Sequence, residues 1–88
     1  MASYKVLSKA SVARDLRSLP KATVTRIVEK IERLGEEPFP PRTVKLEGGE
    51  DLYRIRVGDY RVVYTVDRSA RQVMVHSVRH RRDVYRKF

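Results

Sequence analysis

Apolar and charged residues alternate through the middle of the chain in the pattern of a β-hairpin. Two alternating runs flank the pair Gly58-Asp59, which suits a two-residue turn of type II′. That turn fixes the register and places Arg56 opposite Arg61. Because side chains alternate across a strand, the tyrosine and aliphatic residues share one face, and Arg54, Arg56 and Arg61 share the other.

The first half of the chain shows helical spacing instead. Apolar residues between positions 12 and 19 predict one helix, with Ser8 or Ser11 as its N-cap. Pro20 breaks the pattern and opens a second helix, for which Gly35 is the expected C-cap. The second helix carries the strongest apolar stripe of the chain: Val24, Ile27, Val28, Ile31 and Leu34. Its other side carries Lys21, Arg26, Lys30 and Arg33, which we expect to form a solvated face.

The remaining elements complete a small sheet. Strands are expected at 4–7, 52–57, 60–66 and 71–78, with a candidate short strand at 44–46 and a candidate short C-terminal helix at 81–88. The predicted fold class is α+β, in which two N-terminal helices pack on one face of an antiparallel sheet in the order β-α-α-β-β-β. Residues 1–88 form a single domain.

The helices can cover only one face of this sheet, so the arginine face is expected to stay open. Pairing odd-numbered residues of the last two strands brings Ser77 or Arg79 next to Arg61. The last strand is expected to place Val73 and Val75 on one face, and Met74, His76 and Val78 on the other, helix-facing side.

Like charges directly opposite each other destabilise a sheet. An anion held between Arg56 and Arg61 would explain why these residues stand there, and we therefore expect an anion site.

Composition supports a polyanionic partner. The chain has 88 residues, 20 Lys and Arg against 11 acidic residues, a net charge of +9 and a pI of about 10.4. Arginine dominates and its planar fork suits phosphate, so nucleic acid is the first expected partner and an acidic protein the second. The absence of cysteine excludes a disulfide framework and a cysteine-based zinc site. With no signal peptide and no long apolar run, we expect a cytoplasmic protein that does not enter a membrane.

The chemistry follows from the residue types. Arginine is a poor proton carrier, but it clamps phosphate oxygens and stabilises transition-state charge. A cleft suited to a phosphodiester is therefore expected from Arg54, Arg56, Arg61 and Arg79. Proton transfer needs other groups, and His80 and Tyr85 in the C-terminal run could reach the end of the last strand.

The hairpin Leu52–Tyr64 and the tail Val78–Tyr85 together resemble the RelE family of toxins from type II toxin–antitoxin modules. The element order is similar to the RelE/ParE superfamily fold, and the resemblance covers essentially the whole chain. It implies a ribosome-dependent messenger RNA endonuclease that needs no metal or cofactor. In this family the ribose 2′-hydroxyl attacks its own 3′-phosphate in the A site, leaving a 2′,3′-cyclic phosphate and a 5′-hydroxyl. The implied partners are a RelB-like antitoxin, the ribosome and messenger RNA.

The resemblance also implies a role for each site residue. Arg61 would hold the phosphate and stabilise its developing charge, and Arg79 would neutralise the leaving side or assist protonation of the 5′-oxygen. Tyr85 would orient or stack the nucleotide, and His80 would be a general acid or base. The alternatives to these functional roles are structural: His80 would be only a surface residue, and Tyr85 would simply pack the tail against the sheet.

This sequence departs from some active members at two positions. Arg54 and Arg56, expected to bind substrate phosphates, stand where those members carry lysines. Arginine cannot replace lysine as a base, so His80, Tyr85 or a ribosomal group must take that role. Two other functions therefore stay open: a ParE-like poison of DNA gyrase, and a non-catalytic or decayed toxin that only binds RNA and antitoxin.

Overall fold

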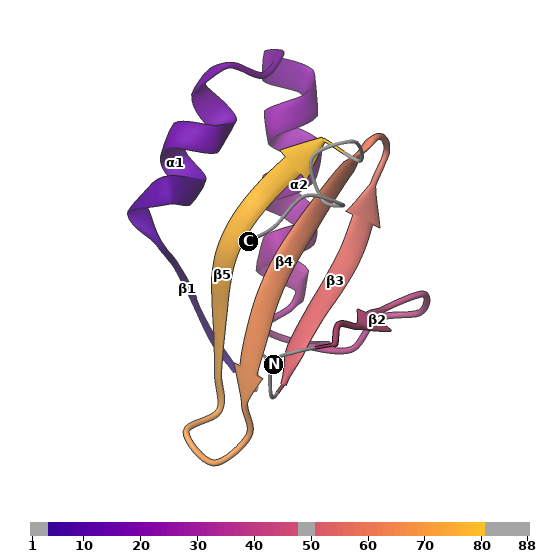
Figure 1. The fold of residues 1–88 in the computed structure, drawn as a ribbon. Coiled ribbons are helices and arrows are strands. Elements are labelled where there is room, and N and C mark those ends of the chain that lie inside the picture. Colours follow the sequence, from indigo (N-terminus) through magenta and orange to yellow (C-terminus); the bar gives the residue numbers. More distant parts are fainter. Residues whose placement is uncertain (1–3, 48–50, 81–88) are drawn as a thin grey trace.

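The computed structural model describes residues 4–47 and 51–80, which form two helices lying against one face of a five-stranded sheet (Figure 1). In chain order the elements are β1 (Lys5–Ser8), α1 (Ala10–Arg17), α2 (Lys21–Arg33), β2 (Val44–Lys45), β3 (Leu52–Val57), β4 (Tyr60–Asp67) and β5 (Gln72–His80). The α+β class is confirmed, and the candidate strand at 44–46 adds one strand to the predicted order. The candidate C-terminal helix at 81–88 lies outside the described residues.

The sheet is antiparallel except at one edge. Its strand order is β1-β5-β4-β3-β2, and β1 runs parallel to β5, with Lys5 beside Gln72 and Ser8 beside Val75. The three-stranded meander of β3, β4 and β5 leaves one side of β5 unpaired, and β1 covers it. The sequence predicted the antiparallel sheet but not this parallel pairing, because a pairing between strands far apart in the chain leaves no local signal.

The hairpin register is confirmed. Arg56 lies opposite Arg61 and Tyr53 opposite Tyr64. Gly58 has φ +60°, and Asp59 is not among the described residues with positive φ, as a type II′ turn requires. The residues of β3 and β4 that point toward the helices form the core together with residues of β5 and both helices. The buried core consists of Val12, Ile27, Ile31, Leu34, Tyr53, Ile55, Val57, Val62, Tyr64, Val66, Val73, Val75 and Val78.

The face assignment predicted for the last strand was wrong. Val73, Val75 and Val78 all lie in the helix-facing core, although 75 and 78 differ in parity. The cause is a β-bulge: Tyr64 pairs with Val75 but Val63 pairs with Ser77, so one extra residue enters β5 at this point. The bulge inverts the alternation in the second half of the strand.

Two side chains of α1 satisfy the backbone of this bulged segment. Ser11 Oγ donates a hydrogen bond to the His76 carbonyl at 3.0 Å, and Asp15 Oδ2 accepts one from the Val78 N–H at 3.0 Å. Ser11 and Asp15 are four residues apart and therefore lie on one side of the helix. The expectation that Ser8 or Ser11 caps α1 was wrong, since the N-cap is Lys9 without a side-chain hydrogen bond. The Ser11 hydroxyl instead forms its hydrogen bond with β5.

Gly35 does not act as a left-handed helix cap. The C-cap of α2 is Leu34, and Gly58 is the only described glycine with positive φ. Gly35 is instead the point where the end of α2 meets β1, because its carbonyl accepts a hydrogen bond from the Tyr4 N–H at 2.8 Å. A Cβ on Gly35 would lie 3.0 Å from the Tyr4 oxygen and 3.2 Å from Val6 Cγ2.

Gly35→Ala is expected to lower the free energy of unfolding by about 1–2 kcal/mol, because the added methyl forces β1 away from α2. Urea denaturation monitored by circular dichroism measures this change. Glu36→Ala, at the exposed neighbouring position, is the control and should stay within about 0.5 kcal/mol of the parent. Equal stability of Gly35→Ala and the parent would contradict a close contact here.

Candidate functional site

The register of three neighbouring strands brings three arginines into one row. Arg56 of β3 lies opposite Arg61 of β4, and Arg61 lies opposite Arg79 of β5. Adjacent strands are about 4.8 Å apart, so the three backbones hold these side chains within reach of one anion. Arg54 lies two residues before Arg56 and so belongs to the same face. The structure thus brings together the four arginines that were expected to form the site.

The arginine face is less open than expected, because its centre is buried. Arg61 is only 9% exposed and its neighbours Val63 and Ser77 are buried, whereas Arg56 and Arg79 at the sides are exposed. At the level of the row only β4 has a paired strand on both sides, because β2 pairs with Tyr53 and Arg54 and β1 pairs with residues 72–75. A buried guanidinium interacts with an anion in a lower dielectric than an exposed one does. Arg61 is therefore the position where a phosphate charge would be felt most strongly.

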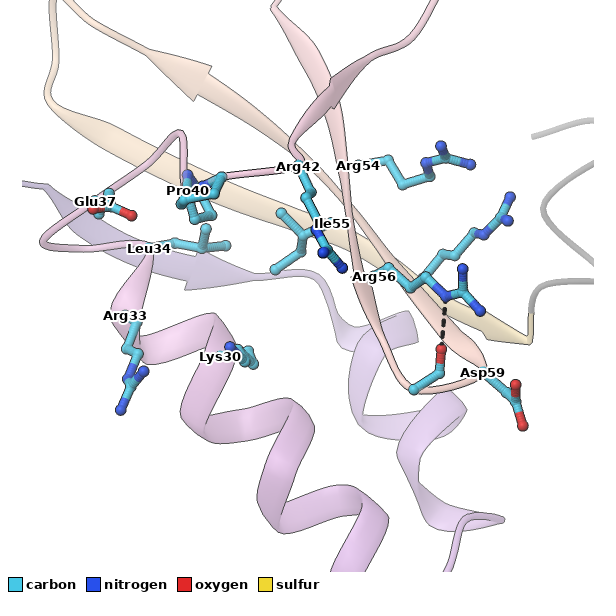
Figure 2. A pocket seen from close by; sticks show the side chains of 13 residues that line it. Lys30, Arg33, Leu34, Glu37, Pro40, Arg42, Arg54, Ile55, Arg56 and Asp59 are labelled. Atoms are coloured by element: carbon cyan, nitrogen blue, oxygen red, sulfur yellow. Dashed lines mark hydrogen bonds between the residues drawn. The ribbon is translucent and has the colours of Figure 1, made fainter.

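The turn helps to orient one arginine of the row. Arg56 Nε donates a hydrogen bond to the Gly58 carbonyl at 3.0 Å, which is the dashed line in Figure 2. This bond uses one donor of the fork and leaves both terminal nitrogens for an external acceptor. The tight turn that sets the register therefore also restrains the Arg56 guanidinium.

Ser77 places a hydroxyl within this face. The residue is 6% exposed, and its Oγ makes no hydrogen bond in the described part of the chain. A buried hydroxyl without a partner is destabilising. We therefore expect Ser77→Ala to raise the free energy of unfolding by up to about 1 kcal/mol.

Thermal and urea unfolding of Ser77→Ala measure this gain. Ser69→Ala, in the exposed turn between β4 and β5, is the matched control and should change nothing. If Ser77→Ala were less stable than the parent, its hydroxyl would have to be satisfied in solution.

The structure does not bring His80 to the arginine row. His80 pairs with Tyr60, and their rings meet edge to face at 5.4 Å between centroids. Tyr60 packs against the helix-facing core, so the His80 ring lies on the face opposite Arg79. Adjacent residues of a strand point to opposite faces. Because Arg79 lies in the row beside Arg61, the next residue, His80, has to face the other side of the sheet. Tyr85 lies outside the described residues, and its role stays a prediction.

His76 lies on the arginine-bearing side of the sheet, and not toward the helices as expected. Its Nε2 is 3.0 Å from Thr65 Oγ1, and Thr65 alternates with the buried Tyr64 and Val66. Burial lowers the pKa of His76, and the positive charge of Lys9 lowers this pKa further. His76 therefore favours the neutral form and is a structural residue at the bulge.

A cleft of about 890 Å³ opens beside the arginine row, between α2, the loop that follows it and the edge of β3 (Figure 2). Its charged lining is strongly basic and comprises Lys30, Arg33, Arg42, Arg54, Arg56 and Arg61 against Glu37 and Asp59. Neither Arg79 nor His80 lines it. A second cleft of about 380 Å³ continues along α2 and shares Lys30, Arg33 and Arg56 with the first.

Sequence reasoning missed Arg42 as a residue of this cleft. The Thr43 N–H bonds to the Pro40 carbonyl at 3.1 Å, which closes a turn with Pro41 and Arg42 at its centre. Arg42 has φ +72°, so the turn is of type II, whose third position normally holds glycine. An L-residue in this left-handed conformation costs about 1–2 kcal/mol. The run Pro40-Pro41-Arg42-Thr43 signals a turn, but it does not show which residue takes the strained position.

Two further observations concern other kinds of site. Among residues 4–47 and 51–80, no cluster of three or more His, Asp or Glu side chains has the arrangement of a metal site. Neither of the two described helices has the length and apolar character needed to cross a membrane.

The helix pair on a mostly antiparallel sheet is the fold of the RelE/ParE toxins. The chain belongs to this family, since the model of the ParE toxin of type II toxin–antitoxin systems matches residues 6–85. It is similar to toxin RelE of Mycobacterium tuberculosis, with 35% identity over 91 residues covering 94% of this chain and 87% of the relative. On this basis the chain is a RelE-type toxin.

Solved structures agree with this assignment. The fold is similar to that in the archaeal RelE–RelB complex of Pyrococcus horikoshii, with a TM-score of 0.80, 38% identity, and coverage of 90% of this chain and 96% of the other. It is also similar to the isolated RelE toxin of E. coli, with a TM-score of 0.74, 26% identity, and coverage of 88% and 83%.

Proposed function

We propose that this toxin cleaves messenger RNA on the ribosome and so stops translation. The observation that carries the proposal is the row of Arg56, Arg61 and Arg79 in register across three strands. Like charges in such a row oppose folding, and a bound phosphodiester removes the repulsion. The resemblance to the RelE family implies this substrate class, and the similarity to RelE toxins supports the family.

The proposed reaction is an internal transesterification. The 2′-hydroxyl loses its proton and its oxygen bonds to the adjacent phosphorus, while the bond from phosphorus to the 5′-oxygen breaks and that oxygen gains a proton. Arg61 holds the non-bridging oxygens, where negative charge grows in the transition state, and Arg79 neutralises the leaving side. Arg54 and Arg56 bind phosphate from the β3 side.

No described residue of the arginine face is suited to be the base. Arginine does not release its proton at neutral pH. The His80 ring packs on Tyr60, on the face of the sheet opposite the arginine row. We assign proton transfer to Tyr85 or to a group of the ribosome. This assignment accounts for dependence on the ribosome, which would supply the geometry or the base that the isolated chain lacks.

A RelB-like antitoxin is the proposed regulator. The similar structures from Pyrococcus horikoshii and Mycobacterium tuberculosis were solved as toxin–antitoxin complexes of RelE with RelB. A chain with net charge +9 attracts an acidic segment, and covering the arginine row would block phosphate binding.

The competing function is inhibition of DNA gyrase, because the family model that matches residues 6–85 is named for ParE. A gyrase poison has no need of a phosphodiester site, so the arginine row favours RNA cleavage. A non-catalytic toxin that binds only RNA and antitoxin is the third possibility.

The deciding experiment is a purified translation reaction on a defined messenger RNA, with and without ribosomes. We expect cuts inside the A-site codon only when ribosomes are present, mapped by primer extension, with 2′,3′-cyclic phosphate ends. An intact message together with loss of gyrase supercoiling activity would establish the ParE function. An intact message with active gyrase would leave binding as the role of the arginine face.

A further inference from the structure

We propose that the cleft beside α2 binds the sugar–phosphate backbone of the same RNA strand, next to the reacting phosphate, and that Arg42 is its anchoring residue. The inference rests on the proposed RNA-cleaving function and extends its substrate site around the edge of β3. In this proposal the loop after α2 contacts the RNA in addition to the arginines of the sheet.

The first argument is charge. The two clefts together are lined by seven basic and three acidic side chains: Arg26, Lys30, Arg33, Arg42, Arg54, Arg56 and Arg61 against Glu29, Glu37 and Asp59. Arg26, Lys30 and Arg33 are four and three residues apart, so they follow one side of α2. A linear polyanion fits a basic groove of this kind better than a single small anion does.

The second argument is continuity with the arginine row. Arg56 lines both clefts and also stands in the row beside Arg61. The short strand β2 pairs only with Tyr53 and Arg54, so it stops before Arg56 and leaves the edge of β3 uncovered there. An RNA strand whose reacting phosphate lies at Arg61 can therefore pass Arg56 and enter the cleft, and it contacts basic side chains along the whole path.

The third argument is the backbone of Arg42. Its φ of +72° is a conformation that glycine adopts without strain, yet the chain places an exposed arginine there. Figure 2 shows the Arg42 side chain hanging from the loop into the cleft beside Ile55, and Lys30 enters the cleft from α2. The turn thus presents the Arg42 guanidinium to the cleft, where a phosphate would accept its hydrogen bonds.

Arg71 provides a matched control within the same chain. It is also an exposed arginine with positive φ, at +52°, but it lies in the turn between β4 and β5 and lines neither cleft. Arg42→Gly and Arg71→Gly remove the same charge and relieve the same kind of backbone strain. Both variants should be at least as stable as the parent.

The test measures binding without cleavage. A fluorescent single-stranded RNA carrying a 2′-O-methyl group at the reacting nucleotide is titrated with the antitoxin-free toxin at low salt, and affinity is followed by anisotropy. We expect Arg42→Gly to weaken binding about five- to tenfold and to flatten the slope of log K against log salt by about 0.7, the value for one phosphate contact on a single strand. Arg71→Gly should keep the parent's slope.

The location of the phosphate that Arg42 contacts is tested with RNAs that each carry one neutral methylphosphonate linkage. For the parent toxin, a linkage flanking the reacting phosphate should reduce affinity, and Arg42→Gly should be insensitive to that same linkage. Equal effects of Arg42→Gly and Arg71→Gly, or no RNA binding by the parent, would overturn the inference. So would an Arg42→Gly variant that loses antitoxin affinity but keeps RNA affinity.

These readouts are independent of catalysis. A toxin that binds as expected but leaves ribosome-bound messages intact would refute the proposed cleavage and keep the cleft as an RNA site. A toxin that cleaves normally after Arg42→Gly, with unchanged RNA affinity and salt slope, would refute the cleft and keep the cleavage.

Discussion

Arg61→Ala is expected to reduce ribosome-dependent RNA cleavage by about 10²–10³-fold, the usual consequence of removing one preorganised donor from a charged transition state. Arg61 is the central and most buried member of the arginine row, flanked by Arg56 and Arg79. Its removal therefore takes away the donor with the lowest local dielectric. Single-turnover cleavage on programmed ribosomes measures the loss, and induced expression should no longer arrest growth.

Arg61→Lys distinguishes geometry from charge. Lysine keeps the positive charge but lacks the planar fork, so activity should fall between that of Arg61→Ala and the parent. Because Arg61 is buried, urea unfolding of both variants must show that they are folded at the assay temperature. Cleavage by a folded Arg61→Ala within a few fold of the parent would remove Arg61 from the proposed mechanism.

Asp15→Ala is expected to lower the free energy of unfolding by about 1–3 kcal/mol, because it leaves the Val78 N–H without an acceptor in a buried strand. Urea denaturation measures the change. Asp15→Asn is the matched control: its amide oxygen can still accept the bond, so most of the stability should return. Equal stability of Asp15→Ala and the parent would mean that water satisfies the Val78 N–H.

The same contact should influence activity, since Val78 directly precedes Arg79 in β5. The bulge at His76 inverts the alternation of the strand, and without it Arg79 would share the helix-facing side with Val73 and Val75. We therefore expect the double variant Ser11→Ala with Asp15→Ala to lose cleavage even under conditions where it is fully folded. A folded double variant with full activity would show that the bulge holds without α1.

What could be predicted from sequence was local in origin. Gly58-Asp59 and the alternating runs beside it determine the hairpin, and the pairing of Arg56 with Arg61 follows from them. The α2 stripe was right for Ile27, Ile31 and Leu34, which are buried, but Val28 is 37% exposed. A small sheet covers only part of a helix circumference, and Val28 lies beyond that part.

The errors arose where distant segments meet. The bulged segment bonds to Ser11 and Asp15, more than sixty residues earlier in the chain, and alternation alone gave the wrong faces for Val73 and Val75. Arg79 was nevertheless placed correctly, because odd-to-odd pairing holds beyond the bulge. The basic cleft was missed because a helix, a loop and a strand edge that are separate in sequence build it together.

The position of β5 at the inside of the sheet has a consequence for synthesis. β5 is the last described strand, yet it lies between β1 and β4, so the sheet is split until residues 72–80 have emerged from the ribosome that makes them. Arg79 arrives with that strand, and the arginine row is incomplete before then. The arginine row that we propose as the phosphate site is therefore not assembled before residues 72–80 have been synthesised. The same long-range closure, with the first described strand paired to the last described one, raises the contact order and slows folding.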